Sequence, residues 1–167
     1  RQQQEAQREL MNSLLLIREN LSLLLNDSNK VMNLVENSAN QANIRSLLQS
    51  SSLNYSGFSV YKSITAQLNA IVNSRDYIDS IYVYVPNTQQ RYLTNQGKVF
   101  TLQEEPDANW YEECVKDDRN MRLVRRTVKQ YSFQANGPQY LTIVEQNSRE
   151  SVVAVNILAS YFRRIFN

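Results

Sequence analysis

The stretch Ile78-Asp-Ser-Ile-Tyr-Val-Tyr-Val85, followed by Pro86-Asn87, marks where the character of this 167-residue chain changes. Most of its residues are β-branched or aromatic, and Pro-Asn is a typical turn sequence, so we expect a strand that ends at Val85. Before Asp76 the apolar residues recur at helical spacing, whereas after it they recur with a period of two. We therefore predict a helical region over 1–76 and a sheet region over 77–158.

The helical region begins with a long helix, which we expect from Gln2 to Glu36. An apolar stripe at alternating spacings of four and three runs through it, and further leucines widen that face, which indicates packing against the domain over part of its length. The segment Asn26–Asn29 has poor helix propensity and is a candidate kink or break. A short helix around Ile44–Leu48 and a third helix capped by Ser59 follow. The stripe consists of Leu10, Leu14, Ile17, Leu21, Leu24, Val31 and Val35.

The sheet region alternates short strands with turn sequences. One helix interrupts it, from Ala108 to about Lys116, with Asp107 as its cap. Because short turns join consecutive strands, the sheet is expected to be antiparallel and the fold class α+β. A last helix is expected over 159–167. The predicted strands are 78–85, 91–94, 121–129, 139–146 and 152–157, and 98–102 is a further candidate for pairing.

The amino-acid composition excludes several common kinds of catalytic and binding site. The chain has no His, which is the commonest general base and metal ligand, and its single Cys, Cys114, forms neither an intrachain disulfide nor a thiolate cluster. Its three glycines stand apart, so no phosphate-binding loop is present. The net charge of +2 gives no reason to expect nucleic acid as a partner. We expect no catalysis, no cofactor and no metal in this chain.

The order of these patterns resembles a known family. A helical stalk precedes Ile81–Asn87, then comes Trp110-Tyr111 on a helix, then Val153–Ile157 before a final helix. This is similar to the extracellular Cache sensor domains of Gram-positive membrane-bound histidine kinases and AraC-like regulators. The resemblance implies a PAS-like five-stranded antiparallel sheet. The long N-terminal helix and the short helices would pack on this sheet.

The resemblance also implies a setting and a partner. Both ends of the chain would continue into transmembrane helices that are absent here, with the sensor domain facing the outside of the cell membrane. A small polar molecule would bind between one face of the sheet and the helix that carries Trp110. The terminal helices, including 159–167, would transmit the signal to a cytoplasmic output of the two-component or transcription-regulator type.

Aromatic side chains are the first candidates for the ligand site. Trp110 and Tyr111 would form one wall, or Trp110 would simply fill the core between helix and sheet. Tyr82 and Tyr84 share one strand face, and we expect them to face the ligand because Ile81, Val83 and Val85 form the drier face. Tyr140, on a later strand, would join them, or the tyrosines would form a plain aromatic ladder without a ligand.

Polar candidates lie on the later strands. Of Arg125 and Arg126 only one points to the ligand side, and we select Arg126, which would bind a carboxylate or phosphate, or would otherwise be solvated or ion-paired. In the amino-acid-binding branch of the family, an Arg stands two residues before the Trp and an Asp on the last strand. Here these positions hold Ala108 and Asn156, so hydroxyl or amide groups of a neutral ligand suit Asn156 better.

Two other features have simpler interpretations. The acidic residues between 104 and 113, which include Asp107, lack the pattern of a calcium loop and are interpreted as a solvated acidic loop. The stripe of the first helix supports an alternative to ligand sensing, in which that helix forms a homodimer and the chain is a structural or protein-interaction module.

Overall fold

The computed structural model describes residues 1–49, 55–86, 88–104, 107–108, 110–115, 121–127, 139–147 and 151–160. The helical region contains α1 (Gln2–Glu36), α2 (Ser38–Gln49) and α3 (Tyr55–Asn73). The sheet region contains β1 (Ile78–Tyr84), β2 (Arg91–Thr94), β3 (Val99–Thr101), α4 (Trp110–Cys114), β4 (Met121–Thr127), β5 (Gln139–Gln146) and β6 (Val152–Leu158).

The predicted α+β class is confirmed, with a long N-terminal helix and shorter helices on an antiparallel sheet. The five predicted strands are all present, and β3, which lies within the candidate pairing segment 98–102, extends the sheet at one edge. The strand order is β3-β2-β1-β6-β5-β4, so the last strand lies in the middle of the sheet. Most of the predicted exit helix, residues 161–167, lies outside the described residues.

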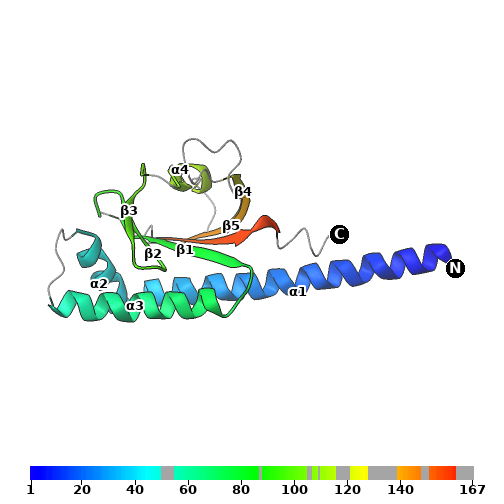
Figure 1. Cartoon of the computed structure of the whole chain (residues 1–167), viewed down its shortest axis with the longest axis horizontal. Coiled ribbons are helices and arrows are strands. Elements are labelled where there is room, and N and C mark those ends of the chain that lie inside the picture. The colour runs from blue at the N-terminus through cyan, green and yellow to red at the C-terminus, as the bar shows by residue number, and fades with distance from the viewer. Residues whose placement is uncertain are drawn as a thin grey trace.

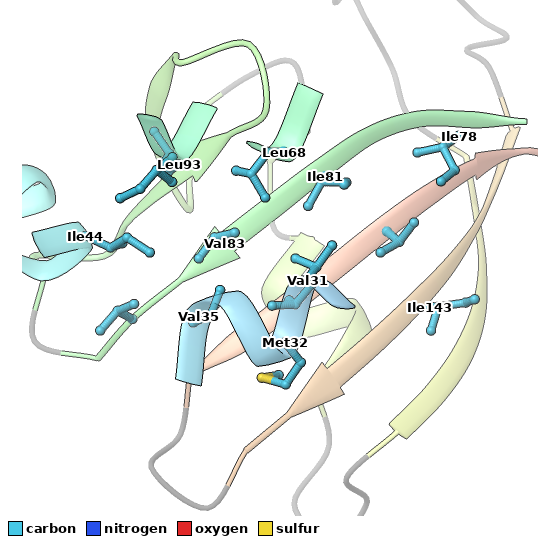
Figure 2. Packing of buried hydrophobic residues seen from close by; sticks show 14 of the residues in the cluster. Val31, Met32, Val35, Ile44, Leu68, Ile78, Ile81, Val83, Leu93 and Ile143 are labelled. Carbon is cyan, nitrogen blue, oxygen red and sulfur yellow. The ribbon is translucent and has the colours of Figure 1, made fainter. Parts of the chain in front are cut away.

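Two layers cover the sheet on opposite faces. Figure 1 shows α1 and α3 on one side of it and α4 on the other. On the helical side, Val31, Met32 and Val35 of α1 pack on Ile81 and Val83 of β1 (Figure 2). On the α4 side, a second and smaller cluster surrounds Trp110. The sheet therefore separates a mainly aliphatic core on the helical side from a mainly aromatic core on the α4 side.

A bulge at the start of β1 sets which side chains face each layer. Ile78 pairs with Ile157 and Ser80 with Asn156, so Asp79 is the extra residue of the bulge. The extra residue shifts the alternation and places Ile78, rather than the charged Asp79, in the helical-side core. Ser80 then begins the row of side chains that faces α4.

The structure corrects two details of the helices. The possible break at Asn26–Asn29 is absent, since α1 continues through it. Asp27 and Ser28 are buried there with partners: Arg75 and Tyr77 donate to the Asp27 carboxylate, and Ser28 donates to Glu145. Ser59 does not cap the third helix, because α3 begins at Tyr55.

Candidate functional site

The side chains facing α4 follow from the period of two along each strand. Ser80, Asn156 and Thr142 are direct partners across β1, β6 and β5, and so form a polar row on one face. Arg126 of β4 pairs with Tyr140 and therefore lies diagonal to Thr142. Tyr82, two residues beyond Ser80, stands on the same face. These residues come from four neighbouring strands.

Arg126 lies at the centre of this face with its side chain almost fully buried. Its Nη1 and Nη2 donate to the two oxygens of Asp107 at 2.7 and 3.0 Å, a bidentate ion pair. Its Nε donates to Thr142 at 2.9 Å, and Nη2 also donates to Asn156 Oδ1 at 2.7 Å. Burial alone would lower the pKa of Arg126, but the bond and charge of Asp107 outweigh it and raise the pKa. The guanidinium therefore stays charged.

The partners of this ion pair are themselves fixed by hydrogen bonds. Thr142 Oγ1 donates to Asn156 Oδ1 at 2.8 Å, and Asn156 Nδ2 donates to Ser80 at 3.0 Å. The Tyr82 hydroxyl donates to Asp107 Oδ2 at 2.8 Å. Each member of the network is buried or half-buried. The result is a closed polar network with a balanced pair of charges inside the α4-side cluster.

An aromatic layer covers the network. Trp110 of α4 is fully buried, with its ring centroid 5.2 Å from that of Tyr82 and 5.3 Å from that of Tyr92. Tyr111 lies against both Trp110 and Tyr84, at 5.9 and 5.0 Å. Burial, followed by the charge of Asp107, raises the pKa of Tyr82 and of Tyr92 above the usual value. Both phenols are therefore neutral hydrogen-bond donors at pH 7.

One polar atom in this layer lacks a partner. Trp110 Nε1 is buried and makes no hydrogen bond within the described residues. The Tyr92 hydroxyl lies close enough to this N–H for the indole to affect the pKa of Tyr92. The two groups nevertheless do not meet hydrogen-bond geometry. A buried donor left in this state costs about 1–3 kcal/mol.

The structure brings all the predicted site residues to one face of the sheet. Tyr82, Arg126 and Asn156 are members of the network, and Tyr84, Trp110 and Tyr111 belong to the aromatic layer. Tyr140 is buried on β5 as the pairing partner of Arg126, and burial, followed by the charge of Asp79, raises its pKa. The expectation that Tyr82 and Tyr84 face away from Ile81 and Val83 is confirmed. The side chain of Arg125 lies outside the described ones.

Asp107 is the residue that sequence reasoning misjudged. It was interpreted as a helix cap in a solvated acidic loop, but it is only 5% exposed and its carboxylate is held by Arg126 and Tyr82. Glu112 and Glu113 of the same segment are exposed, as expected. Thr142 and Ser80 were also missed, although a polar residue within an apolar, β-branched strand is a signal of a buried hydrogen bond.

The described part of the chain contains neither a group of metal-ligating side chains nor a membrane-spanning helix. There, no group of three or more His, Cys, Asp and Glu side chains is placed to hold a metal ion. Likewise, none of its helices has both the length and the apolar character needed to cross a bilayer. Comparison of the chain with protein-family models, with curated proteins and with solved structures gave no match.

Proposed function

We propose that this chain is a sensor module that binds a small polar molecule beneath α4, at the network formed around Arg126. The observation that carries the proposal is the ion pair of Arg126 and Asp107, buried in the smaller of the two cores under an aromatic layer. Buried titratable groups with convergent polar partners and aromatic walls are typical of ligand sites.

Stability alone is a weak reason for such a network. Removing two charges from water costs several kcal/mol per ion, and apolar side chains of similar volume are often equally stable in the same place. The opposite face of this same sheet shows that alternative, since it is packed with aliphatic side chains. The polar residues of the α4 face therefore favour recognition as their role.

The setting we propose is the one implied by the resemblance to Cache domains. The module would face the outside of a bacterial cell membrane and belong to a histidine kinase or an AraC-like regulator. Two features of the fold support it. The N-terminal half of α1 extends beyond the sheet, and β6 ends on that same side of the molecule (Figure 1). Changes at the site would thus reach both ends of the chain through α1 and β6, without catalysis in this module.

A ligand screen by thermal unfolding tests the binding proposal. A ligand at 100 times its Kd adds about 2.7 kcal/mol, which corresponds to a rise in Tm of about 5–10 °C for a chain of this size. The screen should include sugars, amides and small carboxylates. Arg126→Lys keeps the charge but loses the bidentate geometry, so we expect it to weaken the response to a hit.

Arg18→Lys is the matched control, because Arg18 is exposed on α1, far along the chain from the site. We expect it to respond as the wild type does. If a broad screen yields no shift, or if each hit binds Arg126→Lys as tightly as the wild type, the proposed site is wrong.

The exposed part of α1 favours a second candidate function, a homodimeric interaction module. Several large apolar residues between Leu10 and Leu25 of this helix are exposed in the monomer, which is uncommon for a surface helix without a partner. We propose a second copy of this chain as that partner, since the stripe has the spacing of helix pairing. The exposed residues are Leu10, Met11, Leu14, Leu15, Leu16, Leu23 and Leu25.

A further inference from the structure

Arg126 already holds a carboxylate. The two oxygens of Asp107 accept parallel hydrogen bonds from Nη1 and Nη2, which is the geometry by which a guanidinium recognises any carboxylate. Asp107 is not part of the sheet; it belongs to the segment between β3 and α4. The structure therefore displays, with an internal group, the contact that an external carboxylate would make.

The two halves of this ion pair are supported differently. Arg126 is on a strand, and its remaining contacts are to Thr142 and Asn156, also on strands, with Asn156 anchored in turn by Ser80. The receptor half is thus built into the sheet. Among the described residues, the Asp107 carboxylate is held by the side chains of Arg126 and Tyr82. Exchange of Asp107 for another carboxylate would leave the guanidinium and its supports in place.

Trp110 supplies a second, independent observation. Its indole N–H is fully buried without a hydrogen-bond acceptor in the described residues, three positions along the chain from Asp107. Its ring contacts that of Tyr82, whose hydroxyl is bonded to Asp107. An unpaired donor at the border of a charged network is the expected state of a site that lacks one acceptor.

We propose that Asp107 is an internal competitor for the ligand, and that the ligand is a small monocarboxylate that displaces Asp107 from Arg126. This inference rests on the proposed function and specifies its ligand class and regulation. Charge favours a carboxylate over a phosphate dianion, because one negative charge balances Arg126 exactly as Asp107 does. Displaced Asp107 moves into water, and Trp110, three positions along the chain, moves in response. The occupied and empty states then differ in the position of Trp110.

The test uses acetate and acetamide, which have nearly the same shape but differ in charge. Trp110 is the single Trp of the chain, so its fluorescence, excited at a wavelength that the ten Tyr do not absorb, reports on α4. In the wild type we expect a saturable change with sodium acetate, at constant ionic strength, and none with acetamide. In Asp107→Asn the competing charge is absent, so the Kd for acetate should fall about tenfold or more.

Two control variants complete the experiment. Glu112→Gln removes one negative charge from the exposed face of α4 and should leave the Kd for acetate unchanged. The double variant Asp107→Asn/Arg126→Met carries no charge within the α4-side network and should not respond to acetate. If Asp107→Asn does not fold, the wild-type titration decides alone: no saturable response to acetate, formate or propionate overturns the proposal.

Further outcomes separate this inference from the proposed function. Equal acetate affinity in the wild type, Asp107→Asn and Glu112→Gln would contradict the role of Asp107 as competitor. If the ligand screen instead yields a neutral molecule whose binding depends on Arg126, the sensor proposal stands and the carboxylate proposal falls.

Discussion

Tyr82 connects the two layers of the site, since its hydroxyl bonds to Asp107 and its ring packs against Trp110. Its folded-state pKa is raised by burial and by Asp107. The unfolded chain ionises this phenol near pH 10, whereas the folded chain retains the proton to higher pH. Its contribution to stability is therefore fully present below about pH 10 and is lost as the pH rises above that value.

Tyr82→Phe should accordingly have two effects. At pH 7 it removes a hydrogen bond to a charged group and should lower the free energy of unfolding by about 1.5–3 kcal/mol. Above pH 10 the wild type should lose about 1.4 kcal/mol per pH unit through Tyr82, and the variant should lose that much less. Urea unfolding at pH 7, 9, 10 and 11 measures both. Parallel pH profiles of variant and wild type would contradict the assignment.

For single residues, the sequence predicts the face of the sheet on which a side chain lies. It does not predict which distant residue that side chain binds. The period of two is a local property, so it placed Tyr82 and Tyr84 on one face of β1 and Ile81 and Val83 on the other. The pairing of Asp107 with Arg126 joins residues 19 positions apart through the tertiary fold. No local pattern distinguishes a carboxylate that meets a buried guanidinium from one that remains in water.

Among the elements, α1 has two parts with different surroundings. Leu24, Val31 and Val35 are buried against the sheet and its neighbouring helices, whereas Leu10 and Leu14 are more than half exposed. Apolar spacing alone gave the bounds of the helix, Gln2–Glu36, because a stripe that long has few alternatives. It could not show where packing ends, since the same stripe continues through both parts.

Because α1 has a packed part and an exposed part, the same Leu→Ala substitution should cost much more stability in one part than in the other. Leu24→Ala leaves a cavity in the core and should lower the free energy of unfolding by about 2–5 kcal/mol. Leu14→Ala, at an exposed position, should change it by less than about 0.5 kcal/mol. Chemical denaturation at low protein concentration, where self-association does not contribute, makes the comparison. Similar losses in the two variants would contradict the division.

For a related reason, helix propensity wrongly allowed a break of α1 at Asn26–Asn29, where the helix is continuous. Helix propensity describes an isolated helix, in which Asp and Ser compete for backbone hydrogen bonds. In the folded chain Asp27 is paired with Arg75, and Ser28 with Glu145. These long-range partners occupy the side chains and override local preference.

For the whole molecule, the exposed leucines of α1 predict self-association. Leu14→Glu places a charge within the exposed apolar face and should shift a dimer toward monomer. Asn12→Asp is the matched control, because it adds the same charge at an exposed polar position of the same helix. Sedimentation velocity at about 10–100 µM compares the three proteins. A wild type that remains monomeric over this range, or a dimer that survives in Leu14→Glu, would contradict the interaction-module candidate.

The central position of β6 has a consequence for how the chain folds. β6 is the one strand in the described residues that joins the β3-β2-β1 half of the sheet to the β5-β4 half. Its pairing with β1 connects residues 68 to 79 positions apart, so that contact carries a large loop-closure entropy. We therefore expect the two half-sheets to remain unjoined during synthesis until β6 has left the ribosome, and the sheet to form late, after the helices.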